Sequence, residues 1–408
     1  MHSESSAASR PQPLAMGCTV IGSGCSDDVL RTWLTPWQEP DQAVTLFLVL
    51  AGTATAEVEG ISAAGATAAA RRFTALADAE LLLFGPGRQR RWPLPPLPAG
   101  VSPALISRVA AEWLGLTPLV AAAGLPLAPQ FPHLRLEPAN RGPAACLSSG
   151  QAMDLKRVQV LWQRGWRLGK GLRGPLLLAE CVPGGTTTAQ AVLTGLGLSV
   201  ADLISGSARI PPMNLKQSLV ERGLRAAQLP IQPSPQSVLA AVGDPFQALA
   251  AGLLLGAMEA DQPVLLGGGS QMVAVLALAL AAEGQTGRQQ LAEGVCLGTT
   301  AWLAAESDRC QGRPGALGGL LDRTMNHFGV QLKGLATGLR FEASRHSRLR
   351  DYELGFVKEG VGAGALSLLA QLRGASIQEL LEACDRAMDH LAATEGSSAR
   401  DCPVGSQP

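Results

Sequence analysis

The sequence is poor in charged and aromatic residues and has no excess of charge of either sign. Charged residues make up 16% and aromatic residues 4% of its 408 residues, and 33 lysines and arginines balance 33 aspartates and glutamates. A chain without net charge has no overall field to hold a polyanion or an anionic membrane. The chain also has no run of the roughly 20 apolar residues needed to span a bilayer. We therefore expect neither a nucleic-acid partner nor a membrane partner.

Cysteines at metal-binding spacing are also lacking. The eight cysteines include no Cys-x-x-Cys pair, and no histidine stands at zinc-ligand spacing from them. This pattern favours free thiols in a reducing compartment, and it predicts a cytoplasmic protein with no metal and no cofactor. Residues 1–16 are rich in Ser, Ala and Pro and lack the apolar core of a secretory signal, so we expect a disordered tail there.

Apolar material is plentiful: 47% of the residues are hydrophobic, which is enough for a large core. Short apolar runs that end in small residues are typical of strands buried on both faces of a parallel sheet. These runs cover residues 46–52, 81–85, 119–124, 175–180, 263–269 and 294–300. Helical patterns lie at residues 103–114, 152–164, 186–196, 215–227, 245–258 and 270–282. Strands and helices alternate, which predicts an α/β fold with a mostly parallel sheet.

The two ends of the chain differ from this alternating middle. Residues 17–40 show little periodicity, and the segment 341–408 contains a helical pattern without a partner strand. We expect both segments together to form a small helical cap on a large α/β domain over residues 41–340.

Two glycine-rich turns follow predicted strands and precede predicted helices, at residues 180–188 and 264–271. In a parallel sheet, ligands lie beyond the carboxyl ends of the strands, and a glycine-rich turn before a helix favours an anion such as phosphate. Gly184, Gly185 and Gly269 are the candidate backbone donors. Neither turn has the Gly-Lys-Ser/Thr or Gly-x-Gly-x-x-Gly spacing of ATP or dinucleotide sites. Packing is the better explanation of either turn alone, and the presence of two such turns in one sheet shifts the balance modestly toward a phosphate ligand.

A third motif surrounds Lys216. Asn214 and Gln217 have the spacing of a helix N-cap and its capping-box partner, so a helix is predicted to begin at Asn214. This places Lys216 in the first turn, where the helix dipole disfavours a cation unless an anion is nearby. A solvated surface lysine explains the residue as well as a phosphate ligand does.

A fourth motif is the acid Glu359, which is followed by small residues up to Ala365 and then by an apolar helical pattern. Small neighbours leave room beside the carboxylate for a flat ring, and a helix dipole would keep the acid ionised and able to act as a base. The alternative is that Glu359 only stabilises the start of the helix.

Taken in order, these motifs resemble nicotinate-nucleotide:dimethylbenzimidazole phosphoribosyltransferase, the family that builds the lower-ligand nucleotide of cobamides. The resemblance covers residues 44–369, and its best parts are residues 180–188, 214–216, 250–270 and 358–365. It implies a doubly wound domain with helices on both faces, a small helical domain from the two termini, and a homodimer. It also implies transfer of phosphoribose from nicotinate mononucleotide to a benzimidazole or purine base.

The resemblance also implies roles for individual residues. Glu359 corresponds to the general base of the family, and Glu180 to a second acid near the ribose. The positions that hold the nucleotide phosphate are Thr186, Thr187, Gly206, Ser207, Lys216 and Gly268. The typical Asp-His-Gly at the end of the first strand is replaced by Leu50-Ala51-Gly52-Thr53, which indicates a divergent branch and leaves the acceptor base open.

Two other interpretations stay open at this point. A catalytically weak relative could bind nicotinate mononucleotide as a sensor or supplier, using the phosphate turns without Glu359. A structural protein could use the same glycine-rich turns for packing alone. A serine hydrolase is disfavoured, because the chain has no Gly-x-Ser-x-Gly elbow.

Overall fold

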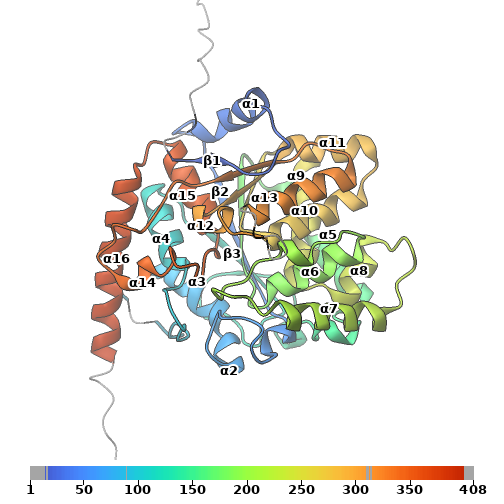
Figure 1. The fold of residues 1–408 in the computed structure, drawn as a ribbon, viewed down its shortest axis with the longest axis horizontal. Coiled ribbons are helices and arrows are strands. Elements are labelled where there is room, and N and C mark those ends of the chain that lie inside the picture. Colours follow the sequence, from blue (N-terminus) through green and yellow to red (C-terminus); the bar gives the residue numbers. More distant parts are fainter. Residues whose placement is uncertain (1–13, 15–16, 89, 309–311, 313–314, 399–408) are drawn as a thin grey trace, which may run out of the picture.

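An eight-stranded sheet runs through the protein in the order β1-β8-β7-β6-β5-β2-β3-β4. The computed structural model describes residues 14, 17–88, 90–308, 312 and 315–398 (Figure 1). The strands are β1 (Thr19–Val20), β2 (Thr45–Ala51), β3 (Leu119–Ala123), β4 (Leu134–Arg135), β5 (Leu176–Cys181), β6 (Val264–Gly267), β7 (Val295–Thr299) and β8 (Lys333–Ala336). Every described pair of strands is parallel except β1 with β8.

The order of the strands reverses direction at β2. From β2 the chain continues outward through β3 and β4 on one side, and then returns to build β5, β6, β7 and β8 on the other. The predicted doubly wound α/β fold is therefore confirmed. In such a sheet the carboxyl ends of the two strands at the reversal, β2 and β5, border the natural ligand crevice.

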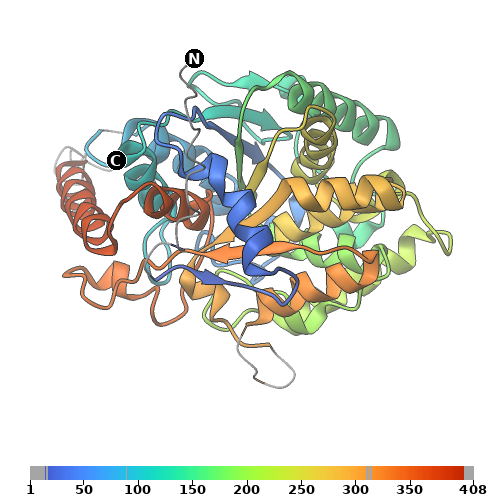
Figure 2. The ribbon, with the colours of Figure 1, turned by 90° about the horizontal axis from the view of Figure 1, so that it is seen from above.

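Helices cover both faces of the sheet, and each face has its own apolar core (Figures 1 and 2). One layer contains α5 (Leu155–Gly171), α6 (Gly185–Gly195), α7 (Met213–Ala227), α8 (Pro235–Val242), α9 (Pro245–Glu259), α10 (Ser270–Ala282), α11 (Gln285–Gly294) and α13 (Ala316–Phe328). The other contains α1 (Asp27–Gln38), α3 (Thr74–Phe84), α4 (Ala104–Trp113), α14 (Ser347–Arg350), α15 (Ala363–Leu372) and α16 (Ile377–Ser398). Short helices α2 (Ala68–Arg71) and α12 (Ala301–Ala304) complete the described α-helices.

Some of the predicted elements are wrong in detail. The strand expected at residues 81–85 is instead the end of helix α3 and the glycine after it. The capping box expected at Asn214 is absent, because α7 begins one residue earlier and the residue before it, Pro212, has no side-chain donor or acceptor. Strand β8 was not predicted.

The terminal segments relate to this sheet in different ways. The disordered tail expected at residues 1–16 lies outside the described residues, apart from Leu14. In the segment after it, β1 pairs with β8, so Thr19 is opposite Ala336 in the main sheet. The division into a helical cap and a large domain stays a prediction.

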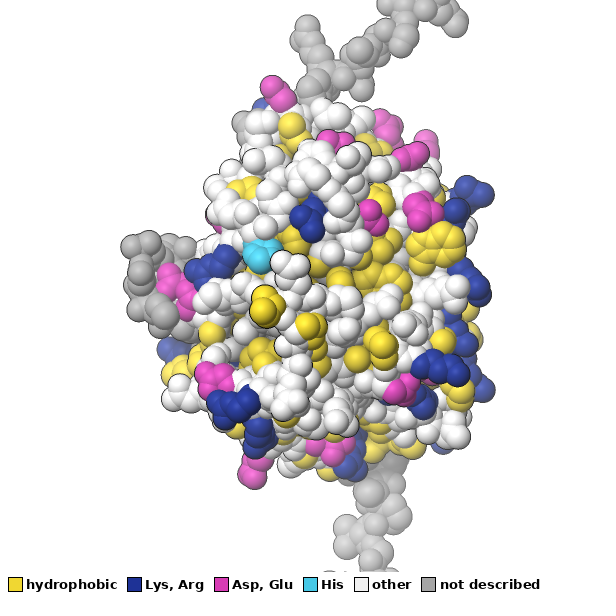
Figure 3. Space-filling view, turned by 90° about the vertical axis from the view of Figure 1, so that its right-hand side faces the viewer, with side chains coloured by type: hydrophobic (Ala, Val, Ile, Leu, Met, Phe, Trp, Pro, Cys, Tyr) yellow, Lys and Arg dark blue, Asp and Glu magenta, His cyan; other side chains and the backbone are white. Residues whose placement is uncertain are grey.

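The surface carries charges of both signs rather than a field of one sign. Figure 3 shows basic and acidic side chains scattered around one face, with hydrophobic side chains between them. Among the helices of the described part, none is long and apolar enough to cross a membrane.

Candidate functional site

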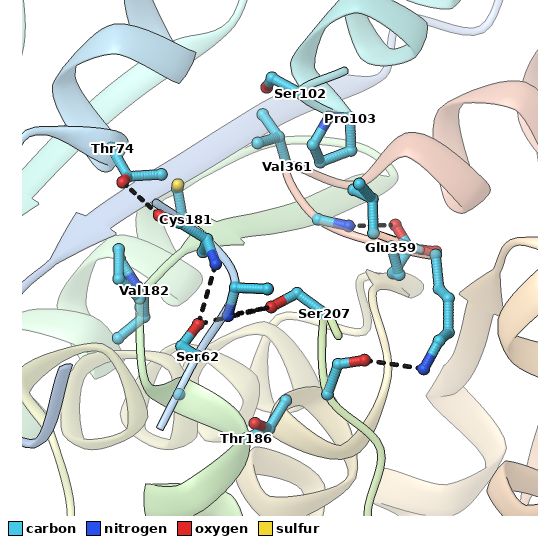
Figure 4. A pocket seen from close by; sticks show the side chains of 18 of the residues that line it. Ser62, Thr74, Ser102, Pro103, Cys181, Val182, Thr186, Ser207, Glu359 and Val361 are labelled. Atoms are coloured by element: carbon cyan, nitrogen blue, oxygen red, sulfur yellow. Dashed lines mark hydrogen bonds between the residues drawn. The ribbon is translucent and has the colours of Figure 1, made fainter. Parts of the chain in front are cut away.

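A cavity opens at the carboxyl edge of the sheet, beside the ends of β5 and β6 and the loop after β2 (Figure 4). It lies at the reversal point of the strand order, where ligands of doubly wound proteins bind. The predicted site residues that line it are Glu180, Gly184, Gly185, Thr186, Gly206, Ser207, Gly269 and Glu359. Thr187 and Gly268 are not among the lining residues, and Lys216 reaches the site through a hydrogen bond to Thr186.

The turn between β5 and α6 can bring backbone amides close to an anion. Gly184 has a left-handed conformation with φ +81°, which side-chain-bearing residues adopt at a cost. A Cβ at Gly184 would also lie 3.0 Å from the amide nitrogen of Ala56, so only glycine fits easily. Helix α6 starts at Gly185, whose amide donates to the carbonyl of Val182, and the amides of Thr187 and Thr188 donate to the carbonyl of Gly184. The turn therefore offers an anion the amide and hydroxyl of Thr186 and the positive end of the helix dipole.

Lys216 is fully buried and directed toward this turn. Its Nζ donates to Thr186 Oγ1 at 2.7 Å and to the carbonyl of Ser205 at 2.6 Å. The interpretation as a solvated surface lysine is therefore wrong. A buried ammonium close to the first turn of α6 adds positive charge where a phosphate would sit.

Ser207 lines the same cavity and is hydrogen-bonded to the loop after β2. Its Oγ accepts a hydrogen bond from the amide of Ala63 at 3.1 Å, and it lies 3.4 Å from Ser62 Oγ. These contacts are visible in Figure 4. The loop is held from behind by the buried Arg71, whose guanidinium donates to the carbonyls of Val58 and Gly65. Arg71 was not among the predicted site residues, because nothing in the sequence distinguishes this arginine from a surface residue.

Glu359 is fixed in place by donors from the end of β7 and from its own loop. Oε2 accepts from Thr299 Oγ1 at 3.1 Å and from the amide of Thr300 at 2.9 Å. Oε1 accepts from the amides of Gly360 at 3.0 Å and Gly364 at 3.3 Å. Burial nevertheless raises the pKa of Glu359 to about 7, although these donors lower it. The amide of Gly364 in the first turn of α15 thus favours the ionised acid as expected, but burial outweighs it, and the resulting pKa suits a base that works near neutrality.

The loop that carries Glu359 is strained and is held by a buried ion pair. Val357 and Lys358 both have left-handed φ values, +62° and +68°. Lys358 Nζ contacts Glu306 Oε1 at 2.9 Å and donates to the carbonyl of Gly206 at 2.8 Å. Glu306 also accepts from the hydroxyl of Ser205. This network joins the loop of Glu359 to the turn that lines the phosphate end of the cavity.

Glu180, the second acid, lies at the end of β5 and lines the same cavity. Burial and then the nearby carboxylate of Asp244 raise its pKa to about 8, while the amide of Val182 lowers it. Two carboxyl groups in one cavity with pKa values raised into the neutral range are typical of sites that move protons.

Behind the phosphate end lies a buried network that the sequence analysis did not find. Asp244 caps α9 with a complete capping box that involves Gln247. Its Oδ2 also accepts from Thr188 Oγ1 at 2.6 Å and from Gln271 Nε2 at 2.8 Å. The start of α9 thereby positions the starts of α6 and α10, both of which border the cavity. The spacing of Asp244 and Gln247 is a capping-box signal from which the start of α9, and with it this network, could have been predicted.

The raised carboxyl pKa values predict a stability profile for the ligand-free protein. The folded-state pKa values of Glu359 (about 7) and Glu180 (about 8) exceed the ordinary value of 4.5. The native state therefore binds more protons than the unfolded state from about pH 4.5 to pH 8, and stability falls as pH rises through this window. We expect a lower melting temperature at pH 8.5 than at pH 5.5, and a flatter profile in Glu180→Gln. A melting temperature equal at both pH values would contradict this.

Comparisons with known sequences show which proteins this chain is similar to. A sequence model of a family described as Phosphoribosyltransferase matches residues 105–288. A UPF0284 protein of Prochlorococcus marinus (strain MIT 9313) is 67% identical over 95% of this chain and 96% of its own length. A UPF0284 protein of Parasynechococcus marenigrum (strain WH8102) is 63% identical over 94% of this chain and 97% of its own length.

Solved structures share the fold at low sequence identity. CobT from Thermus thermophilus is 19% identical, with a TM-score of 0.55 over 87% of this chain and 89% of that chain. A structure of nicotinate-nucleotide-dimethylbenzimidazole phosphoribosyltransferase from the same organism gives the same TM-score over 88% of its chain. The resemblance predicted from the motifs is therefore confirmed.

Proposed function

Because this chain belongs to the UPF0284 family and shares its fold with nicotinate-nucleotide-dimethylbenzimidazole phosphoribosyltransferase, we propose that it is a phosphoribosyltransferase. The proposed reaction moves phosphoribose from nicotinate mononucleotide to a benzimidazole or purine base. It would make the lower-ligand nucleotide of a cobamide, in a homodimer. The observation that best supports the proposal is the cavity that brings a buried lysine and glycine-rich turn together with two carboxyl groups of raised pKa.

In the proposed mechanism the 5′-phosphate is an anchor. The turn at Gly184 and Gly185, the amide and hydroxyl of Thr186, and the hydroxyl of Ser207 would lie around it, and the ammonium of Lys216 would add positive charge through its contact with Thr186. Gly206 and Gly269 line the same cavity, whereas Thr187 and Gly268 do not. Binding energy from the phosphate, which does not react, holds the anomeric carbon in line with the attacking base.

The chemical step is a displacement at the anomeric carbon. One ring nitrogen of the acceptor base forms the new C–N bond as the bond to nicotinate breaks, and nicotinate leaves with the electron pair. The other ring N–H becomes acidic as positive charge develops, and Glu359 accepts that proton. Glu180, at the end of β5, lies where a second acid would face the ribose.

Release of nicotinate on mixing the protein with nicotinate mononucleotide and a base tests the transferase directly. Nucleotide binding without nicotinate release would favour the sensor or supply interpretation. If no phosphorylated nucleotide raised the melting temperature, the structural interpretation would be favoured instead.

Removing the ammonium of Lys216 is expected to weaken nucleotide binding. Loss of a charge-assisted hydrogen bond costs about 1.5–3 kcal/mol, so Lys216→Ala should raise the Kd for nicotinate mononucleotide by that free energy. The measurement is isothermal titration calorimetry. Lys333→Ala is the matched control, since Lys333 is also buried but donates to the carbonyl of Ala292, which does not line the cavity, whereas Lys216 donates to the lining residue Thr186. Equal affinity in both variants would show that Lys216 does not hold the phosphate.

A further inference from the structure

The end of the cavity away from the phosphate turns has mostly apolar walls. They include Leu94, Leu97, Pro103 and Val361, and the loop after β2 closes one side. Figure 4 shows Thr186 and Ser102 on opposite sides of the cavity, with Glu359 beside the space between them. With the phosphate at Thr186 and proton transfer at Glu359, the acceptor ring would extend toward Ser102.

Besides Arg348, whose guanidinium donates to the carbonyl of Gly100 and to Glu395, the polar side chains near this apolar end are Thr74 and Asp78 of α3, and Ser102 before α4. Asp78 is 4% exposed, so its carboxylate has almost no contact with bulk water. A carboxylate in such a place needs donors, because an unsatisfied buried charge is strongly unfavourable.

The hydrogens of the neighbouring side chains are already committed within the protein. Ser102 Oγ donates to Asp78 Oδ1 at 2.6 Å, and Cys181 Sγ donates to Asp78 Oδ2 at 3.4 Å. Thr74 Oγ1 donates to the carbonyl of Ala64 at 2.7 Å. A carboxylate can accept about four hydrogen bonds, so Asp78 has acceptor capacity beyond these two. What these side chains offer to a ligand is therefore lone pairs.

We propose that Asp78 makes this cavity selective for acceptor bases that carry an N–H or O–H donor on the ring edge away from the attacking nitrogen. The proposal rests on the proposed function and names the substrate class: heteroaromatic bases with an exocyclic amine or a hydroxyl group. Such a donor fills the acceptor positions of Asp78 that Ser102 and Cys181 leave open. A base with only methyl groups or ring hydrogens on that edge leaves those positions of a buried carboxylate unfilled.

The test compares bases of nearly equal shape that differ in this donor. Adenine is paired with purine, and 5-hydroxybenzimidazole with 5-methylbenzimidazole, each with nicotinate mononucleotide, and nicotinate release is measured. A site with an unpaired buried acceptor rejects the analogue that lacks the donor, so kcat/KM should be about 10- to 100-fold higher for the donor-bearing member of each pair. Equal kcat/KM values within both pairs would overturn the assignment of Asp78 while leaving the transferase proposal intact.

Two variants separate selectivity from folding. Asp78→Leu should remove or reverse the preference, because a leucine favours the apolar ring edge. Asp78→Asn keeps the shape of the side chain and should reduce the preference even if the leucine variant does not fold. The matched control is Asp385→Asn: Asp385 is similarly buried and accepts from Ser344 Oγ at 2.5 Å, but it lies outside the cavity lining. An unchanged preference in Asp78→Asn and Asp78→Leu would refute the role of Asp78.

Failure of the proposed function gives a different result. If no base releases nicotinate, the transferase proposal fails, and calorimetry with the same four bases then tests the selectivity alone. Tighter binding of adenine than purine, and of the hydroxyl than the methyl compound, would support Asp78 as a base-selecting residue of a binding protein. Equal binding would overturn both proposals.

Discussion

Glu359→Gln is expected to lower turnover by about 10²–10⁴-fold, the usual contribution of a positioned general base. The substitution keeps the shape of the side chain but removes its ability to accept a proton. Glutamine can still accept from Thr299 and Thr300 through its carbonyl oxygen, but its amide nitrogen then faces the amides of Gly360 and Gly364, so the melting temperature of the variant is measured alongside its turnover. Binding of nicotinate mononucleotide should barely change, because Glu359 is proposed to act on the acceptor base rather than on the phosphate. Steady-state kinetics and calorimetry on one preparation measure both effects.

The matched control for this prediction is Glu80→Gln. Glu80 is also buried and accepts a backbone hydrogen bond, from Trp92 at 2.9 Å, but it does not line the cavity. We expect near-normal turnover in this control. If Glu359→Gln also turned over normally, the base would have to be Glu180, whose pKa is raised to about 8, and Glu180→Gln should then show the large loss instead.

The positions of the buried strands along the sequence were the most predictable part of the fold. The runs that became β2, β3, β5, β6 and β7 are apolar, short and closed by small residues, which is typical of parallel strands buried on both faces. The run at residues 81–85 has the same composition, but it ends a helix that is buried on nearly every side. Periodicity cannot separate these two cases. Strand β8 was not predicted because it is short and begins with a buried lysine, Lys333, so it has no clear apolar pattern.

The site was predictable where its residues follow strands and not where they meet through tertiary contacts. Glu180 lies near the carboxyl end of β5 and the turn at Gly184 follows that strand, so the sheet alone places them at the ligand edge. Asp78 lies in the middle of an apolar helix, and its partner Ser102 is 24 residues away. Nothing local in the sequence marks such a pair. The same holds for Glu306, which meets Lys358 across 52 residues.

Helices α5 and α9 approach each other more closely than side chains would allow. A Cβ at Gly165 would lie 1.9 Å from the carbonyl oxygen of Leu249, and one at Gly252 would lie 2.0 Å from that of Trp162. Gly169 and Gly256 repeat this arrangement one turn later, since a Cβ there would lie 2.1 Å and 2.0 Å, respectively, from a carbonyl oxygen of the other helix. The two glycine pairs, each four residues apart, form one stripe on each helix, and backbone lies against backbone along the contact.

Gly165→Ala is therefore expected to destabilise the protein by about 3 kcal/mol, because the added methyl group meets a carbonyl oxygen rather than a side chain that could move. Urea unfolding measures this change. Gly171→Ala, in the last position of the same helix, is the matched control, since a Cβ there meets nothing within 4 Å. The control should be neutral or gain up to about 1 kcal/mol from better helix propensity. Equal stability of the two variants would refute the close contact. Asp244 caps α9 and accepts hydrogen bonds from Thr188 and from Gln271, which lines the cavity. Forcing α5 and α9 apart in Gly165→Ala should therefore also weaken nucleotide binding. Binding should be unchanged in Gly171→Ala.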